Sequence, residues 1–581
     1  MSNNMNLSIQ ILPVEIFHRI FDSVDAQTIL FSIRSVCRLF RAMVNSYDRY
    51  NLDFKLISKS NFHLLCHLIN PQNVLSLRLC DDEYTPKQIT LFISLIRLQQ
   101  FTRLHSITFI GIEEFQLNMI LKRINLNLLT SFSLHIQQYD SRRKKTTANF
   151  LSSILAKSNI RKIKLSINND RISNISWPVN CRINYLVIDS EISFDNMLNI
   201  FSCSSQLHTL ILKQNLPKFI KNMKEICVFP QITSLTIEKL HVTIDQLESF
   251  LVLMPSLIYL KLIGEQCELD GKRCEQFIQI NLPYLNDFEF FIDITKSISQ
   301  MPEDLELIIE SFRSPFWIEY KKWFVVSQIH SNDSYRIHIY SIPICKSVLQ
   351  YEFDSYHTYR SNLTTLLKND PFTTKNITEL VLPFKSSTFE NMTEERLTQT
   401  NVMFPNVTKL NLTIERRSFL NSLKLLTPII NVSKLVEVKL ESHCFHKDNQ
   451  NTLFDIISIL EQAYSLSTLI VHSRYCKYEL YPYLNRICSI IPRQIKHLQI
   501  PMNKLNYIEI ILERCQNLTV VQFEITRSKF SQEVIGWFNQ NTKDSTFQRH
   551  AGCDIIWIGK KINHIEDSHK RFKLDENQCD F

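Results

Sequence analysis

The sequence predicts an α/β protein in which a short unit of helices precedes a long array of strand–helix repeats. Two observations support this prediction. Apolar triplets with the spacing apolar-x-x-apolar-x-apolar recur at intervals of about 23 to 31 residues within each of two runs. Between triplets lie stretches with apolar residues at i, i+3, i+4 and i+7, the pattern of one-sided helices. This period indicates a solenoid with a parallel sheet on its concave side and helices outside.

The N-terminal stretch from Leu12 to Val44 predicts three short helices. Leu12-Pro13 opens the first, because proline suits the first position of a helix. Asp25 is a suitable N-cap for the second. Apolar residues recur at helical spacing in all three helices. So small a unit cannot bury a stable core alone, and it must therefore pack on the following domain, on a partner, or on both.

Four segments of this stretch form an ordered set of motifs: Leu12-Pro13-Val14-Glu15-Ile16, Ile20-Phe21, Ile29 and Val36-Cys37-Arg38-Leu39-Phe40-Arg41. In their order and spacing they resemble the F-box, although Leu39-Phe40 departs from the basic-then-Trp ending of the family. The resemblance implies docking onto the Skp adaptor and, through it, onto the cullin and RING proteins of a ubiquitin ligase, with the rest of the chain selecting a substrate. The alternative is a helical cap on the next domain. The residues expected to contact the adaptor are Leu12, Pro13, Ile16, Phe17, Ile20, Phe21, Val36, Cys37 and Phe40.

The apolar triplets form two runs. The first extends from Val74/Leu77/Leu79 to Leu285/Phe288/Phe290, and the second from Ile377/Leu380/Leu382 to Leu518/Val521/Phe523. In period the array resembles the leucine-rich repeats that often follow an F-box, although most repeats lack the consensus asparagine. Each repeat should contact only its neighbours, so we expect a linear array that loses stability gradually on truncation. The strand Asp554–Ile558 should close its far end.

Between the two runs the triplet pattern lapses. Lys322–His330 and Tyr335–Tyr340 alternate in polarity around Ser331–Ser334, which predicts a β-hairpin inserted into the array. The aromatic residues around Trp317 and Trp323 indicate either a packed seam, which we favour, or a ligand surface. The expected organisation is an F-box at 1–48, the first part of the array at 49–292, irregular repeats with the hairpin at 293–376, the second part and C-terminal cap at 377–559, and a polar tail at 560–581.

Composition excludes several classes of protein. Only 6 glycines occur, and none forms a phosphate-binding loop, so a nucleotide cofactor is not expected. The 15 cysteines contain no C-x-x-C pair, which suits reduced thiols in the cytoplasm, the nucleus or both. The net charge of +8 is too dispersed to predict nucleic-acid binding, and no apolar run is long enough to span a membrane. His443-Cys444-Phe445-His446 offers three metal ligands but no fourth, so we interpret it as a loop.

The concave face is the predicted substrate surface. In each strand, the residues that alternate with the apolar triplet face away from the helices. A mixture of aromatic and charged residues there suits protein binding, and the acidic members should favour a basic segment. For any single residue, a merely solvated position remains the alternative. The residues expected to contact substrate are Tyr185, Asp189, Glu238, Tyr259, Lys261, Asp287, Glu289 and Phe291.

These features favour a non-catalytic adaptor that binds the Skp adaptor through its N-terminal unit and a protein substrate through its repeats. The alternative is a leucine-rich-repeat scaffold that binds proteins without joining a ubiquitin ligase. We expect no catalytic residues, no metal and no cofactor, since no nucleophile or metal-ligand motif occurs in the sequence.

Overall fold

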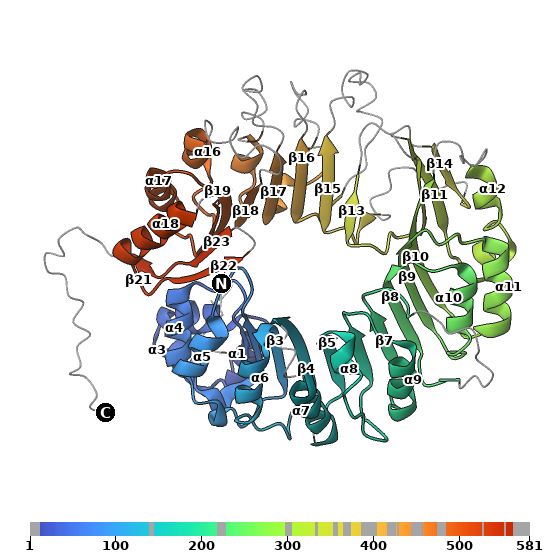
Figure 1. Ribbon diagram of the computed structural model, residues 1–581, viewed down its shortest axis with the longest axis horizontal. Helices are drawn as coiled ribbons and strands as arrows, with labels where there is room; N and C mark the ends of the chain where they lie inside the picture. Colours follow the sequence, from blue (N-terminus) through green and yellow to red (C-terminus); the bar gives the residue numbers. More distant parts are fainter. Residues whose placement is uncertain are drawn as a thin grey trace, which may run out of the picture.

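The computed structural model describes most of the chain as one ring-shaped arrangement of strands and helices (Figure 1). Strands line the inner side of the ring and helices lie on its outer side. The described residues are 12–138, 144–157, 159–217, 228–296, 305–331, 335–351, 358–363, 374–384, 404–414, 426, 429–442, 456, 458–472, 484–525, 528–550 and 553–561.

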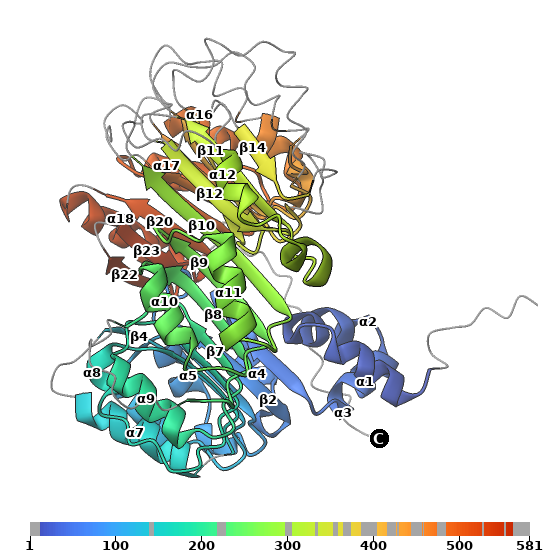
Figure 2. The same ribbon diagram turned by 90° about the vertical axis from the view of Figure 1, so that its right-hand side faces the viewer.

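The N-terminal helical unit (residues 14–46) projects from one side of the ring (Figure 2). Pro13 occupies the residue before α1, with an extended ψ of 151°, and not the first helical position. Asp25 accepts hydrogen bonds from the backbone N–H and the hydroxyl of Thr28, at 2.9 and 2.6 Å, so it begins the second helical segment as expected. The helices are α1 (Val14–Asp22), η2 (Thr28–Ile33), α2 (Arg34–Val36) and α3 (Arg38–Ser46).

Sheet A contains 13 strands among the described residues, of which β1 to β10 run parallel in chain order. The antiparallel strands β12, β11 and β14 extend it beyond β10. Its strands are β1 (Tyr50–Asp53), β2 (Val74–Cys80), β3 (Ser106–Glu113), β4 (Ser131–Gln138), β5 (Lys162–Ser166), β6 (Tyr185–Ile188), β7 (Thr209–Leu212), β8 (Ser234–Leu240), β9 (Tyr259–Glu265), β10 (Asp287–Lys296), β11 (Val325–Ser331), β12 (Tyr335–Ser341) and β14 (Thr358–Ser361).

Sheet B contains nine strands among the described residues. Strands β13 and β15 to β20 run parallel, and β23 and β22 close the sheet as an antiparallel pair. Its strands are β13 (Val348–Gln350), β15 (Glu379–Phe384), β16 (Lys409–Ile414), β17 (Glu437–Ser442), β18 (Thr468–His472), β19 (His497–Pro501), β20 (Val520–Glu524), β22 (Thr546–His550) and β23 (Cys553–Trp557); β21 (Thr542–Lys543) and β24 (Lys560–Lys561) form a separate pair.

Helices connect most successive strands of the first run. The start of α10 illustrates why they form where they do: the Thr243 hydroxyl accepts from the N–H of Gln246, whose side chain accepts from the N–H of Thr243, a reciprocal cap. The helices are α4 (Lys59–Leu68), η3 (Pro71–Asn73), α5 (Gln88–Leu95), η4 (Leu98–Gln100), α6 (Glu114–Leu121), α7 (Lys144–Lys157), α8 (Asn169–Ile172), α9 (Phe194–Cys203), α10 (Ile244–Leu251), α11 (Gly271–Asn281), α12 (Leu305–Glu310), η7 (Phe316–Tyr320), η11 (Val432–Lys434), α16 (Leu484–Ile490), α17 (Asn506–Arg514) and α18 (Ser528–Asn541).

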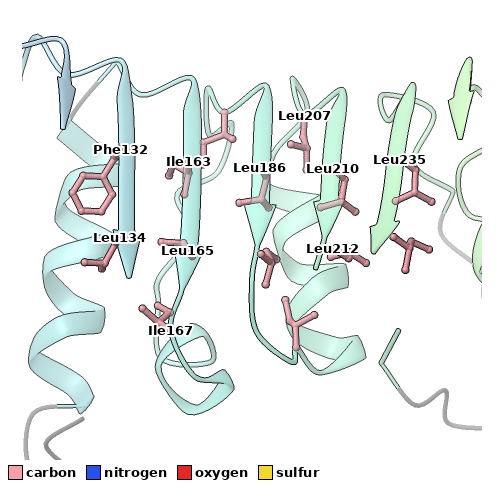
Figure 3. Packing of buried hydrophobic residues seen from close by; sticks show 14 of the residues in the cluster. Phe132, Leu134, Ile163, Leu165, Ile167, Leu186, Leu207, Leu210, Leu212 and Leu235 are labelled. Carbon is pink, nitrogen blue, oxygen red and sulfur yellow. The ribbon is translucent and has the colours of Figure 1, made fainter. Parts of the chain in front are cut away.

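The core lies between the strands and the outer helices. Each predicted apolar triplet places its second and third residues on a described strand, and all three residues of every triplet are buried. Neighbouring triplets pair in register, as in Leu186↔Leu210 and Leu210↔Leu235. Their side chains therefore form rows that continue from repeat to repeat (Figure 3). The predicted strands, their parallel pairing and their buried residues are confirmed.

The first junction between the sheets, which we call the hairpin junction, lies at the end of sheet A that β10, β12, β11 and β14 form, where Phe291, Val326 and Tyr340 pack in the core of sheet B. The predicted hairpin is confirmed, since β11 and β12 pair antiparallel. Trp317 and Trp323 are buried, and their indole N–H groups donate to the carbonyl oxygens of Gly271 and Asn286 at 3.2 and 3.1 Å. These aromatic residues form the packed seam and leave no indole face for a ligand. Of the aromatic residues singled out there, Tyr320 remains 78% exposed.

The second junction, which we call the end junction, joins the two ends of the described array. The Trp557 indole N–H donates to the Ile57 carbonyl at 3.0 Å, and its ring packs on Phe62 with centroids 5.5 Å apart. The Lys59 ammonium donates to the carbonyl of Asp544. The last strands thus pack on the segment that follows the N-terminal helical unit, and the array is a ring where the sequence predicted a linear array (Figure 1).

Candidate functional site: an apolar helical face and the inner sheet face

One face of α1 packs inside the N-terminal helical unit. Phe17 and Phe21 are each 1% exposed. Phe17 makes an edge contact with Phe40, and Phe21 makes one with Tyr47, both with ring centroids 5.5 Å apart. The sequence pattern places both phenylalanines on the adaptor-binding surface, but the structure places them in the core. The reason is that this unit is small and needs its largest apolar side chains for its own packing.

The side of α1 next to these phenylalanines is exposed and carries two isoleucines. Ile16 and Ile20, one turn apart, are 37% and 41% exposed. Leu12 and Pro13, before the helix, and Val36, at the end of α2, are also exposed. We call Leu12, Ile16, Ile20 and Val36 the exposed apolar face. Neighbouring exposed apolar residues, such as Ile16 and Ile20 one turn apart, mark binding sites more often than isolated ones do.

Two other residues of the predicted adaptor-binding set are only partly exposed to solvent. Cys37 is half-buried and has an extended backbone at the start of α3. Phe40 is half-buried, since one side of its ring covers Phe17. Both can contribute to a surface only through the parts that remain exposed.

Two tyrosines fix the helical unit to the first repeat. The Tyr47 hydroxyl donates to Asp22 at 2.9 Å, and the Tyr50 hydroxyl donates to the Val44 carbonyl at 3.0 Å. The Asn73 side-chain amide donates to the Tyr47 carbonyl at 3.3 Å, across to the start of β2. Burial raises the pKa of Tyr50 to about 12, so its hydroxyl keeps its proton and remains a donor. The exposed apolar face is therefore held in a fixed orientation relative to sheet A.

Residues 9–52 match the F-box domain family, a segment that includes the whole N-terminal helical unit and all of β1 except Asp53. No curated protein matches the chain as a relative. The match ends where sheet A begins, so it describes the helical unit and leaves the ring to be interpreted from its own geometry.

The inner face of sheet A presents residues in rows that cross the strands. Because β5 to β10 pair in register, one row extends from Lys162 through Tyr185 to Tyr259 and Asp287. Thr209 and Ser234 complete it. The next row begins at Lys164 and ends at Glu289. We call these two rows the inner rows. Their side chains alternate with the buried triplets and face the inside of the ring.

The structure brings most of the predicted substrate residues together on this face. Tyr185, Glu238, Tyr259, Lys261, Asp287 and Glu289 lie on strands β6, β8, β9 and β10, and Asp189 directly follows β6. Several are partnered within the face. Glu238 pairs with Lys213 at 3.3 Å, and the Tyr259 hydroxyl donates to Glu289 at 3.1 Å. Burial and the nearby Glu289 carboxylate raise the pKa of Tyr259, which keeps its hydroxyl protonated.

Phe291 is an exception and corrects the predicted surface. It is 2% exposed, its ring stacks on Tyr340 with centroids 5.7 Å apart, and the Lys346 ammonium lies 4.9 Å from its centroid. The chain after β12 crosses the inner face here on its way to β13 and packs over Phe291, Tyr340 and Val326. A strand residue that faces inward is thus covered by a distant segment of the chain that contains Lys346.

Inward-facing lysines are the functional candidates that sequence reasoning missed. Lys162 and Lys164 are exposed on β5, and Lys213 follows β7. The sequence pattern already places these lysines on the inner face. They alternate with the triplets Ile160/Ile163/Leu165 and Leu207/Leu210/Leu212, in the same register as the predicted substrate residues. The inner face is therefore not simply acidic, since it carries basic residues at β5 and acidic residues at β10.

Other kinds of site find little support among the described residues. No group of three or more His, Cys, Asp or Glu side chains could hold a metal ion there. No described helix is both long and apolar enough to cross a bilayer. The cysteines within the described ranges are free thiols, and burial raises the pKa of most of them. His443-Cys444-Phe445-His446 and nearly all of the predicted tail at 560–581 lie outside the described residues.

Proposed function

We propose that the chain is a non-catalytic substrate-recognition adaptor of a cullin–RING ubiquitin ligase, active in the cytoplasm, the nucleus or both. Its F-box segment binds the Skp adaptor and, through it, the cullin and RING proteins. The ring, whose period resembles that of leucine-rich repeats, binds a protein substrate on its inner face. Ubiquitin transfer belongs to other subunits, and the chain contributes proximity.

The observation that supports this proposal most strongly is the coincidence of two independent features. Residues 9–52 match the F-box family, and the helices in that segment leave an apolar face exposed while they bury Phe17 and Phe21. A helical cap that served only to cover the first repeat would turn its apolar residues inward. The exposed apolar face instead leaves Ile16 and Ile20 available to a partner, and the tyrosines at its base hold it rigidly.

A paired substitution tests adaptor binding. Ile16→Ala with Ile20→Ala should weaken binding of a purified Skp adaptor about tenfold or more, because truncated apolar anchors at an interface core lose most of their contact energy. Binding is measured by calorimetry with the full chain.

The matched control is Leu64→Ala with Leu68→Ala on α4. These leucines have the same i, i+4 spacing and similar exposure, 47% and 37%, against 37% and 41% for the isoleucines. The control should bind the adaptor as the unaltered chain does. Two results would contradict the ligase role: the Ile16→Ala/Ile20→Ala variant binds the adaptor as tightly as the control variant does, or the unaltered chain does not bind the adaptor. The chain would then be better described as a protein-binding scaffold.

A further inference from the structure

The inner rows carry opposite charges at their two ends. Lys162 and Lys164 are exposed on β5, and no ion pair among the described residues involves either of them. Asp287 is exposed on β10, with Glu289 beside it on the same strand. Lys261 on β9 is the register partner of Glu289 and opposes its charge, so Asp287 carries the acidic end. One row further, Lys213 and Glu238 neutralise each other at 3.3 Å. The inner rows therefore have a basic end at Lys162 and Lys164, a middle without charged residues and an acidic end at Asp287.

The neutral middle is suited to an extended main chain. Its side chains in the first row are the small hydroxyl residues Thr209 and Ser234, with Tyr185 and Tyr259 on either side. Hydroxyl groups both donate and accept hydrogen bonds, so they can meet a peptide backbone of any sequence. Two half-buried tyrosines offer rigid contact area at a small entropic cost.

The strand spacing sets the length of the occupant. From β5 to β10 there are five strand-to-strand steps, which at about 4.8 Å each amount to about 24 Å. An extended chain rises about 3.3 Å per residue, so about seven residues cover this distance. The chain between β12 and β13 covers Phe291 further along β10 but leaves Asp287 exposed, so the first row stays open along its length.

We propose that this face binds an extended peptide segment of about seven residues, acidic at one end and basic at the other, which lies across strands β5 to β10. The acidic end lies on Lys162 and Lys164, and the basic end lies on Asp287. The inference deepens the proposed function, on which it rests, because such a segment would be the recognised part of the substrate. It also replaces the purely basic segment that the sequence alone favours.

Charge reversal with a synthetic probe tests the proposal. The probe is a fluorescein-labelled seven-residue peptide with two glutamates, then Ala-Val-Ala, then two lysines, and the reference is a peptide of the same composition with alternating charges. Fluorescence anisotropy at low ionic strength measures binding to the full chain, because salt screens exposed charges. The segregated peptide should bind about three- to tenfold more tightly than the alternating one, since each exposed ion pair adds little alone.

Charge-reversal variants distinguish an effect of the charge pattern on the inner rows from a general loss of peptide binding. Lys162→Glu with Lys164→Glu should remove the preference for the segregated peptide, and so should Asp287→Lys. All three changes combined should restore it, because the face again has ends of opposite charge and the peptide can bind in the reverse direction. Lys272→Glu and Asp195→Lys, exposed on the outer helices α11 and α9, are the controls and should leave binding unchanged.

Two outcomes would overturn the proposal: single reversals that leave the preference intact, or a combined variant that binds worse than either parent. Ile16→Ala with Ile20→Ala should keep full peptide binding, because the exposed apolar face is remote from the inner rows. A failure of the peptide experiment therefore leaves adaptor binding standing, and a failure of adaptor binding leaves the peptide result standing.

Discussion

The two junctions that close the ring differ in how they are built. At the hairpin junction, the ladder between β10 and β12 within sheet A holds Phe291 and Tyr340 in the core of sheet B, and a cluster of aromatic rings that includes Phe312, Trp317 and Trp323 packs on sheet A. At the end junction, described contacts rest on single side chains, such as Trp557 on Ile57 and Lys59 on Asp544. The hairpin junction joins neighbouring parts of the chain, whereas the end junction joins residues 500 positions apart.

The difference indicates that the junctions fail in different ways. Loss of the hairpin junction removes packing that both sheets share, because Phe288 and Trp317 belong to the core of sheet A while Phe291 and Tyr340 belong to the core of sheet B. Loss of the end junction uncovers Val520, Ile555 and Trp557, which pack in the core of sheet A, but it leaves the backbone ladders and the rest of each core in place. We therefore expect global unfolding in the first case and local opening in the second.

The largest effect is expected from Trp317→Ala. Trp317 is fully buried and contacts Phe312 and Trp323 at centroid distances of 4.9 and 5.7 Å. Its truncation should lower the free energy of unfolding by about 3–5 kcal/mol, measured by urea denaturation followed by circular dichroism. Tyr320→Ala in the same helix is the control, since an exposed residue should cost about 0.5 kcal/mol or less. Equal losses for the two variants would show that the aromatic cluster is not what joins the sheets.

Trp557→Ala should have a smaller and more local effect. It removes the contacts with Ile57 and Phe62 but leaves the parallel strands of both sheets intact. Hydrogen exchange should become about tenfold faster or more in α4 and β23, while β16 and β17 exchange as before. Trp537→Ala is the control, because that indole lies half-buried on α18 and donates only to Glu509, at 3.4 Å. Faster exchange throughout sheet B would mean that the ring behaves as one cooperative unit.

The smallest expected effect is a pH dependence of the end junction that arises from Lys59. Burial lowers the pKa of its ammonium to about 8, against the opposing effect of the Asp544 carboxylate. If the end junction opens, the pKa returns to its ordinary value near 10.5. The closed form then binds fewer protons than the open form, so closure should strengthen as the pH rises from about 8 to about 10.5 and stay level just below this range. His63 nearby, whose pKa burial also lowers, is neutral throughout.

Fluorine NMR of 5-fluorotryptophan at position 557 measures this pH dependence as the ratio of closed to open signals. Lys59→Met should abolish the dependence and close the junction at least as tightly at pH 7, because a buried cation gives way to an apolar chain of similar length. A pH profile that survives in Lys59→Met would assign it to another group.

Local patterns sufficed to predict the strands and the hairpin. A triplet such as Leu207/Leu210/Leu212 predicts both a strand and its buried side chains, because alternate residues of a strand face the same side. The mixed charge of the inner face could also have been found, because Lys162 and Lys164 stand in the same register as Tyr185. For the exposed apolar face, the sequence identified the segment but not its orientation. Ile16-Phe17 and Ile20-Phe21 are adjacent pairs, and helical periodicity alone does not say which member of each pair faces the core.

Contacts between distant segments could not be predicted. Phe291 follows the alternation of its strand, but residues near Lys346 cover it. The local sequence pattern does not predict that this later segment passes over the strand. The end junction is a stronger case, because Trp557 lies in the last predicted strand, whereas Phe62 lies in α4, directly after the N-terminal helical unit. Only the accumulated curvature of some twenty strands brings them together.

The end junction also has a consequence for the newly made chain. Phe62 and Ile57 leave the ribosome early, but the tryptophan that covers them follows about 500 residues later. At a synthesis rate of about 5–20 residues per second, this delay is about 25–100 seconds. Throughout that time the first repeat presents an uncovered apolar edge next to a finished helical unit. A ribosome-bound chain therefore offers chaperones and neighbouring nascent chains a binding surface that the completed protein no longer has.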